Sequence, residues 1–576
     1  MDFHSVTLIT SLLLVFVSAI IGGLVARLLR QPMILGYIGA GVLFGNIVPH
    51  LANQQILQLI ADMGVTLLLF TLGVEFSFYR LRRVLGTIAW AAAVQILSVL
   101  LVFFLLFLWF GFTFLPALFI AAAVSLSSTA IAVKVLSEKG EADSLPSDVS
   151  YGWLIIQDLA VVPLMIILPT LARLSGSSSV TFLSTTGLLA GSLAKAVMAL
   201  AVIVILGHWG VPKLLSRVAT LASREIFLLT TVGLVFLSAV ATYAVGLSAA
   251  LGAFIAGLLV AETSQNHAIF AEIRPLRDLF AVIFFVTLGL LLPVGSVIGR
   301  FGLLIGFTAL VLFMKWFIVL GLARYVGYHR KTAFLIALTL LPMSEFGFIL
   351  AKEGVSLGVL SQEHSVFLVA LTFFTMIAGT PLISRDHEVY YWFYRTLGKR
   401  WPKIFPVKID ETSLPEQMPL SNHVVICGYG RVGKYIGRAL VMANIPFLVV
   451  DYNHTAAHEL RSKGIAVVYG DPADKDVLDF AQVDFAKVII IAIPDKHTQE
   501  MVITNALMLN KRIRIFCRTH HEEDQPYLKS LGVHTIIQPE FEAALSVVEK
   551  LFSEFGVAPD EIPGKISRLK IEHGLG

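Results

Sequence analysis

One carboxylate lies deep inside a long apolar stretch of the sequence. Asp158 follows Gln157, and apolar residues extend for more than a helical turn on both sides, between Gly152 and Pro163. A charge in hydrocarbon is costly unless it is paired or hydrated, so an acid at this position indicates a functional site. Such a carboxylate can hold a proton near neutral pH or exchange the proton for a cation. A structural alternative stays open, in which a protonated or salt-bridged Asp158 only joins two helices.

Two other apolar stretches contain polar groups near their centres. The first contains Ser127, Ser128 and Thr129, and the second contains Pro342, Ser344 and Glu345. Both patterns indicate discontinuous helices, whose free carbonyls and helix ends serve as ion ligands at the middle of a bilayer. For the serines alone, packing of small residues or hydrogen bonding to the preceding turn is the competing interpretation.

A single cation lies well inside a predicted span. Lys315 is flanked by apolar residues from Val311 to Phe317, which makes it a natural partner for Asp158 or Glu345. A purely structural ion pair stays open as the alternative. Other ionisable residues lie nearer span ends or beside hydroxyl-rich stretches, where snorkelling or interfacial capping explains them: Asp62, Glu75, Lys134, Lys195, Glu262 and Asp278.

A glycine-rich motif with a different chemistry follows in the last third of the chain. It comes after a strand-like run and begins a helix-like one, and an acid, Asp451, ends the next predicted strand about 20 residues further on. We expect the nucleotide contacts to come from Gly428, Tyr429, Gly430, Arg431, Val432, Gly433, Asp451 and Asp471. Because an acid at this place favours an unphosphorylated ribose, NAD(H) or an adenine nucleotide such as AMP or ATP is preferred over NADP. A nucleotide fold that has lost its ligand remains the alternative.

The composition defines the elements that must position these groups. The chain has 576 residues, of which 57% are hydrophobic and 14% charged, whereas ordinary soluble proteins carry roughly a quarter charged residues. This composition therefore predicts a membrane protein and excludes soluble enzymes, disordered scaffolds, collagen-like fibres and disulfide-stapled secreted domains. The net charge of +4 gives no indication of a nucleic-acid partner, and two cysteines, Cys427 and Cys517, cannot form a disulfide framework.

The apolar stretches predict about 13 membrane-spanning helices under the 20-residue rule. They lie near residues 6–28, 32–49, 55–76, 85–110, 114–136, 150–172, 187–207, 225–244, 247–262, 278–298, 301–324, 332–353 and 363–384. We expect a transmembrane exchanger domain at 1–384, a proline-containing linker at 385–420, a Rossmann-like domain at 421–552 and a tail at 553–576.

Charge predicts the orientation of these spans. Most basic residues fall in loops that share one side, namely Arg27, Arg30, Arg80, Arg82, Arg83, Lys139, Lys213, Arg217, Arg224, Arg274, Arg277, Arg324, Arg330 and Lys331. By the positive-inside rule this side is cytoplasmic, which places the N-terminus outside and the C-terminal domain in the cytoplasm. The retained first span and the odd number of spans agree with this orientation. Short β-rich runs at 466–469, 487–492, 514–518 and 535–537 complete a doubly wound sheet.

The order of these motifs resembles the monovalent cation:proton antiporter-2 family, of the Kef/YbaL type. The similarity is carried by Gln157-Asp158 in the sixth span, Ser127-Ser128-Thr129 in the fifth and Ser344-Glu345 in the twelfth, and it extends from about residue 6 to 552. The C-terminal part resembles the potassium-conductance regulatory (RCK, TrkA-N) module. It does so through its glycine motif, Asp451, Gly470-Asp471 and the late Gly532 and Pro539-Glu540.

The resemblance implies an inverted-repeat antiporter fold with crossed discontinuous helices and an elevator-type mechanism in the inner (plasma) membrane. A homodimer would exchange cytoplasmic K⁺ or Na⁺ for protons at Asp158, with Gln157 as its neighbour and Ser127, Ser128 and Thr129 in the crossing helix. The Gln-Asp pair resembles the electroneutral type, and an ancillary regulatory subunit is compatible with the family. No catalytic cofactor is expected. The segment after Glu262 departs from the acidic motif of Kef systems, which argues against glutathione gating.

Two rival functions remain at this point. An RCK-gated potassium channel would need a carbonyl filter such as T-V-G-Y-G, and Thr231-Val232-Gly233-Leu234 is the only approach to that motif. A membrane-bound nicotinamide oxidoreductase would need a proton-transfer group beside the glycine loop, and the sequence offers no candidate there. The residues therefore favour an antiporter.

Overall fold

A computed structural model describes most of the chain as two compact units. The described residues are 3–29, 31–47, 54–75, 86–142, 144–175, 204–205, 207–221, 223–244, 249–290, 292–398, 421–519 and 522–572. The first unit contains residues 1–134, 149–326 and 336–383, and the second contains 135–148, 327–335 and 384–576.

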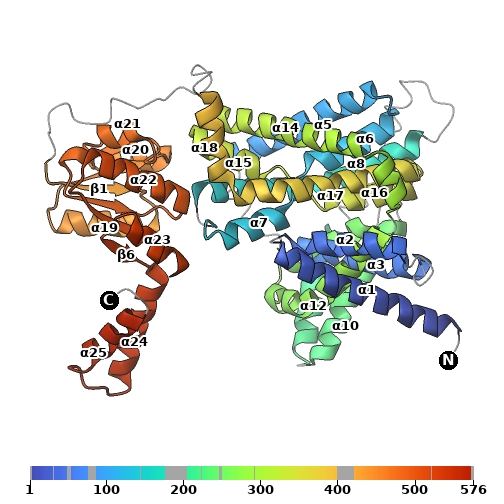
Figure 1. Cartoon of the computed structure of the whole chain (residues 1–576). Coiled ribbons are helices and arrows are strands. Elements are labelled where there is room, and N and C mark those ends of the chain that lie inside the picture. Colours follow the sequence, from blue (N-terminus) through green and yellow to red (C-terminus); the bar gives the residue numbers. More distant parts are fainter. Residues whose placement is uncertain are drawn as a thin grey trace. The chain divides into compact units, whose positions relative to one another are not determined.

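The helices of the first unit pack in two groups. The first group, which we term the glycine bundle, consists of α1 (Phe3–Leu28), α2 (Met33–Ile47), α3 (Gln54–Glu75), α10 (Arg224–Ala244), α11 (Ala249–Ala261) and α12 (Asn266–Leu290). In it α3 packs on α11 and α12, α2 packs on α1 and α12, and α10 packs on α11 (Figure 1).

The second group, the crossing bundle, contains both broken helices. It consists of α5 (Thr87–Trp109), α6 (Phe114–Ser125), α8 (Leu145–Ser175), α14 (Phe301–Val326), α16 (Phe346–Ser356) and α17 (Gln362–Ser384), together with α7 (Thr129–Glu138) and α15 (Arg330–Thr339), of which residues 129–134 and 336–339 belong to the first unit. Here α5 packs on α6 and α14, and α16 packs on α6. A short helix, α13 (Val294–Gly299), precedes α14.

The broken helices confirm the expectation of discontinuous spans. The predicted fifth span is divided into α6 and α7, and the twelfth is divided into α15 and α16. Among the described residues, seven helices are long and apolar enough to cross a membrane, and three shorter apolar helices accompany them. The span expected near 187–207 lies almost entirely outside the described residues, and the number of crossings stays a prediction.

Glycines set the helix separation in the glycine bundle. A Cβ on Gly257 of α11 would lie 2.1 Å from the carbonyl oxygen of Phe70 on α3, and one on Gly73 of α3 would lie 2.3 Å from that of Phe254. Gly41 and Gly289 bring α2 and α12 together in the same way. Small residues thus let these helices approach to backbone contact, which is how helices associate where lipid removes the hydrophobic driving force.

The second unit contains a six-stranded parallel sheet. Its strands are β1 (Val424–Cys427), β2 (Phe447–Asp451), β3 (Val467–Tyr469), β4 (Val488–Ile491), β5 (Arg514–Arg518) and β6 (Thr535–Ile537), in the order β3-β2-β1-β4-β5-β6. The helices between and after them are α19 (Arg431–Met442), α20 (His454–Ser462), α21 (Lys475–Phe480), α22 (Lys496–Leu509), α23 (Gln525–Ser530), α24 (Pro539–Glu554) and α25 (Ile562–Glu572). This strand order is that of a Rossmann fold, so the predicted doubly wound domain is confirmed.

The segments expected to be a linker and a tail both contain helices. Helix α18 (Asp386–Phe393) and a π-helical turn (Tyr394–Gly398) occupy the start of the segment expected to be a linker. Tyr390 is buried and packs edge-on against Phe334, so aromatic packing keeps this part helical although prolines follow it in the sequence. Helix α25 likewise lies in the segment expected to be a tail.

The glycine contacts lead to a prediction about stability. Gly257→Ala should force α3 and α11 apart and cost about 1–3 kcal/mol, the usual cost of overpacking. Gly302→Ala on α14 is the matched control, since an added Cβ there meets nothing within 4 Å. Thermal unfolding of the two variants in detergent measures the difference. Equal unfolding temperatures would contradict the role of Gly257.

Candidate functional site

The two broken helices meet where each is interrupted. Ser127 and Met343 form an isolated antiparallel β-bridge. The backbone N–H of Ser128 donates to the carbonyl of Pro342 (3.1 Å), and that of Ser344 donates to the carbonyl of Leu126 (3.3 Å). The interrupted backbones therefore satisfy part of each other's hydrogen-bonding capacity, which a membrane interior requires.

Helix α8 is attached to this crossing through Gln157. The Gln157 side chain is fully buried, and its Oε1 accepts from the backbone N–H of Ser127 (2.7 Å). The Ser127 hydroxyl in turn donates to the carbonyl of Leu340 (2.7 Å). Gln157 thereby fixes the position of the residue that follows it, Asp158.

Each of the two carboxylates beside the crossing accepts from a hydroxyl of the same short segment. Thr129 Oγ1 donates to Asp158 Oδ2 (2.9 Å), and Ser128 Oγ donates to Glu345 Oε2 (3.1 Å). Ser344 Oγ lies 3.5 Å from the same oxygen of Glu345. The structure therefore brings together the polar residues that the sequence singled out in three separate spans.

Lys315 reaches the crossing itself from α14. Its buried ammonium donates to the carbonyl of Leu126 (2.9 Å) and to Ser127 Oγ (3.0 Å). It therefore supplies positive charge to the C-terminal end of α6, where the free carbonyls carry partial negative charge. The sequence predicted a carboxylate partner for Lys315 and did not predict these backbone and hydroxyl partners.

Sequence reasoning missed Gln95 on α5, which orients Gln157. Gln95 is fully buried, and its Oε1 accepts from Gln157 Nε2 (2.5 Å) and Trp153 Nε1 (3.3 Å). Its own Nε2 donates to the carbonyl of Ser125 (3.0 Å). One amide thus holds α5, α6 and α8 together. A lone glutamine in an apolar stretch was the signal for it.

A cavity of about 270 Å³ lies between the two bundles of the first unit. Its walls come from α3 and α12 on one side and from α16 and α17 on the other. Asp62 of α3 and Lys352 of α16 form an ion pair at this cavity. A polar contact therefore joins the two bundles beside a cavity. Within the glycine bundle, by contrast, the helices touch at their glycines and leave no space between them at these points.

The glycine motif of the second unit has the geometry of a phosphate-binding turn. Gly428 has a φ of 91°, which only glycine adopts without strain. A Cβ on Gly433 would lie 2.2 Å from the carbonyl oxygen of Gly428, whereas one on Gly430 would meet nothing within 4 Å. The turn leads directly into the N-terminus of α19, where helix backbone N–H groups favour anions.

Asp451 ends β2 beside this turn. Its carboxylate accepts from the backbone N–H groups of Tyr429 (2.6 Å) and Asn453 (2.7 Å). Burial raises the pKa of Asp451, while these backbone hydrogen bonds oppose the rise. The acid thus holds the glycine turn in place, in addition to the ribose contact predicted for it.

Asp471 has partners that the sequence did not indicate. Its carboxylate lies 3.4 Å from the ammonium of Lys331, and it accepts from the hydroxyl of Tyr391 (3.2 Å) and the backbone N–H of Ala473 (3.0 Å). Burial acts to raise the pKa of Asp471, but Lys331 and Ala473 hold it below its usual value. Asp471 therefore serves in a buried ion pair, and its contact with a nucleotide stays a prediction.

Broken helices that cross beside a buried amide and a carboxylate, in a chain that also carries a Rossmann domain, define a secondary ion transporter with a nucleotide-type domain. The sequence profile of the family described as sodium/hydrogen exchanger, transmembrane, matches residues 15–384, and that of the TrkA-N domain matches residues 424–539. The chain belongs to the sodium/hydrogen exchanger family and carries a TrkA-N domain. The predicted resemblance is thereby confirmed.

Three relatives match nearly the whole chain. The putative cation/proton antiporter YbaL of Escherichia coli (strain K12) is 30% identical over 552 residues, which are 95% of this chain and 98% of the relative. The glutathione-regulated potassium-efflux system protein KefC of Klebsiella pneumoniae subsp. pneumoniae is 29% identical over 95% of this chain and 84% of its own length. K(+) efflux antiporter 1, chloroplastic, of Arabidopsis thaliana is 28% identical over 94% of this chain and 45% of its own length.

Solved structures match the C-terminal part of the chain. The TrkA-N domain of inner membrane protein ybaL from Escherichia coli is 30% identical and covers 23% of this chain and 99% of its own, with a TM-score of 0.23. The C-terminal domain of a Shewanella denitrificans Kef protein, in AMP bound form, is 22% identical over 26% of this chain and 92% of its own, with a TM-score of 0.24.

The position of Gln95 leads to a prediction. Gln95→Leu should leave Gln157 Nε2, Trp153 Nε1 and the Ser125 carbonyl without this partner, and each buried unsatisfied group costs about 1–3 kcal/mol. Leu101→Ala, at an exposed position of the same helix, is the control. Thermal unfolding in detergent compares the two. A loss no larger than that of the control would contradict the assigned role.

Proposed function

We propose that the protein is an electroneutral antiporter that exchanges K⁺ for protons at Asp158. Asp158 binds either a proton or a largely dehydrated cation, and the two compete for the same carboxylate. The hydrogen bond from Thr129 to Asp158, beside the crossing, is the observation that carries this proposal. It supports a carboxylate held at the point where two helices expose carbonyls and helix ends.

K⁺ is preferred over Na⁺ because relatives are described as potassium-efflux proteins. Two of the three proteins compared above are described as potassium-efflux or K(+) efflux systems, and the third as a cation/proton antiporter. Na⁺ remains the second cation to be tested. The neutral amide of Gln157 next to a single acid supports an exchange of one cation for one proton.

The separation of the two bundles supports alternating access by movement of the crossing bundle. The crossing bundle carries Asp158 and packs on itself through α5, α6, α14 and α16. Between it and the glycine bundle lie the cavity and the Asp62–Lys352 ion pair, whose partners come from different bundles. An ion pair of this kind can break and re-form during a movement at lower cost than a close backbone contact.

The Rossmann domain regulates the exchange in this proposal. An adenine nucleotide or NAD(H) binds at the glycine turn, with its phosphate at the N-terminus of α19 and its ribose at Asp451. We further propose a homodimer in the inner (plasma) membrane, with the N-terminus outside and the Rossmann domain in the cytoplasm. An ancillary regulatory subunit remains compatible with this arrangement.

Asp158→Asn should abolish cation-dependent proton flux, because an amide neither releases a proton nor balances a cation. The flux of reconstituted vesicles should fall to that of protein-free vesicles, measured with a pH-sensitive dye and K⁺, Na⁺ or Li⁺ outside. Asp278→Asn is the control, since Asp278 is an exposed acid on α12 in the other bundle. Undiminished exchange by Asp158→Asn would overturn the assignment. Cation flux without proton coupling would indicate a channel.

Gly430→Val should weaken nucleotide binding by about tenfold or more, equivalent to at least 1.4 kcal/mol. Its side chain would fill the space through which a phosphate approaches the turn, where an added Cβ meets no protein atom within 4 Å. Calorimetry with the purified protein and AMP, ATP, NADH or NADPH measures the change. Gly564→Val, in similarly open space on α25, is the control. Unchanged affinity in Gly430→Val would exclude the glycine turn as the site.

A further inference from the structure

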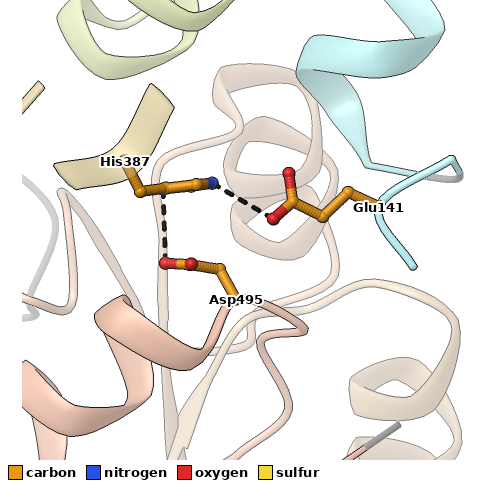
Figure 2. Close-up of side chains that lie close together, drawn as sticks. All are labelled: Glu141, His387 and Asp495. Carbon is orange, nitrogen blue, oxygen red and sulfur yellow. Dashed lines mark ion pairs between the residues drawn. The ribbon is translucent and has the colours of Figure 1, made fainter. Parts of the chain in front are cut away.

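A histidine outside the two sites lies between carboxylates from different parts of the chain. His387 is on α18, directly after α17, and it is buried. Its Nδ1 lies 3.2 Å from Oδ2 of Asp495, and its Nε2 lies 3.5 Å from Oε1 of Glu141 (Figure 2). Asp495 is the N-cap of α22 in the Rossmann domain, and Glu141 lies between α7 and α8. One imidazole thus joins three segments of the second unit.

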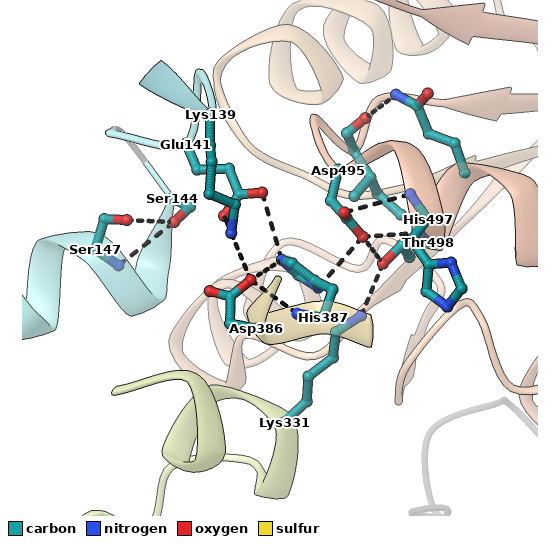
Figure 3. A network of polar contacts seen from close by, with 12 residues as sticks. Lys139, Glu141, Ser144, Ser147, Lys331, Asp386, His387, Asp495, His497 and Thr498 are labelled. Carbon is teal, nitrogen blue, oxygen red and sulfur yellow. Dashed lines mark hydrogen bonds and ion pairs between the residues drawn. The ribbon is translucent and has the colours of Figure 1, made fainter. Parts of the chain in front are cut away.

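Other charged groups complete the surroundings of His387 (Figure 3). Asp386, on the same helix, lies 3.9 Å from Nε2 and also pairs with Lys139, which is 3.0 Å from Glu141. On the Rossmann side, Asp495 accepts from the backbone N–H and the hydroxyl of Thr498. Lys331 of α15 donates to the same hydroxyl and to Tyr391 of α18. Among the described residues, three acids and Lys139 therefore face the ring, with Lys331 behind Asp495.

The arrangement suits an imidazolium. A neutral imidazole has one N–H and one lone pair, so one ring nitrogen would turn a lone pair toward a carboxylate. An imidazolium presents an N–H at both nitrogens, and its charge suits the Asp495 contact, which is an ion pair because Nδ1 has no hydrogen-bond partner among the described residues. Burial acts to lower the pKa of His387, but Asp495, Asp386 and Glu141 together raise it above its ordinary value. Burial acts to raise the pKa of Asp495, but His387, Lys331 and the hydrogen bonds from Thr498 lower it to about 2.

A metal ion fits this cluster less well. Glu141, His387 and Asp495 could offer one ligand atom each. However, the two carboxylates contact opposite nitrogens of the ring, whereas a metal bound to one nitrogen needs both acids on that side. Lys139 also shares Glu141 and would repel a divalent cation.

We propose that His387 is a regulatory site for a cytoplasmic proton, and that in its protonated state it ties the Rossmann domain to the segments that follow α7 and α17. Both segments are continuous in the chain with helices of the crossing bundle, because α7 begins at Thr129 and α17 ends at Ser384. Loss of the proton removes one of the two contacts that His387 makes with Glu141 and Asp495, and this weakens the link between the Rossmann domain and the two segments. The effect on transport rests on the proposed exchange, in which the protonated state restrains the crossing bundle.

The direction of the pH dependence follows from the raised pKa of His387. The tie is fully present below the ordinary histidine pKa of about 6.5 and is lost as the pH rises through the higher folded value. An alkaline cytoplasm therefore releases the crossing bundle. Exchange of K⁺ for an entering proton would then bring the cytoplasmic pH down.

Hydrogen–deuterium exchange of the full-length protein between pH 6 and 9 tests the tie without any measurement of transport. After correction for intrinsic exchange rates, protection of residues 139–142 and of α18 should fall by about tenfold or more as the pH rises. Strand β4 serves as the internal reference. His387→Gln should remove this step, and His387→Arg should keep the protection at alkaline pH. Glu141→Gln removes one acid and should move the step to lower pH by about one unit or more.

Each outcome decides the proposal. A step that persists unchanged in His387→Gln or in Glu141→Gln would overturn it, and protection that depends on added Zn²⁺ and disappears with a chelator would replace it with a metal site. If the step behaves as expected while vesicles show no proton-coupled exchange, then the proton site stands and the proposed transport function fails. If exchange occurs and its pH profile is the same in His387→Gln, the regulatory role fails.

Discussion

The pairing of two interrupted backbones is the interaction on which the candidate ion site depends. A helix that breaks inside a membrane leaves N–H and C=O groups without partners, and each costs several kcal/mol in hydrocarbon. The bridge between Ser127 and Met343 satisfies part of this need, and Lys315 and Gln157 satisfy more of it. Hydroxyls beside the bridge, from Thr129 and Ser128, hold Asp158 and Glu345 in place. The site is therefore a consequence of how the break is stabilised.

The two bundles of the first unit are held together by different physics. In the glycine bundle, backbones touch at Gly41, Gly73, Gly257 and Gly289, and such contacts tolerate almost no displacement. The crossing bundle is tied internally by directional hydrogen bonds from buried side chains such as Gln95. Each bundle is thus rigid for its own reason. A cavity and the Asp62–Lys352 ion pair lie between them, beside apolar contacts such as that of Phe285 on α12 with Phe348 on α16.

The sequence revealed the groups whose burial is costly, and the structure showed what compensates for that cost. Asp158 and the hydroxyls of 127–129 could be found because polar residues are rare in apolar stretches. Their partners could not, since Ser127 meets Leu340 and Ser128 meets Glu345 across more than 200 residues. The doubly wound sheet was predictable because the glycine motif and the β-rich runs are local signals. The ion pair of Asp471 with Lys331 was not, because it joins segments far apart in the sequence.

Protonation has opposite electrostatic consequences at the two proposed proton sites. A proton on Asp158 removes a charge, which makes movement of the crossing bundle through an apolar surrounding less costly. A proton on His387 adds a charge beside Glu141, Asp386 and Asp495, which strengthens the contacts among three segments. Transport needs the first site to gain and lose its proton in every cycle. Regulation needs the second to respond to the cytoplasmic pH, and the three acids around His387 raise its pKa, so that this response falls at a higher pH than for an ordinary histidine.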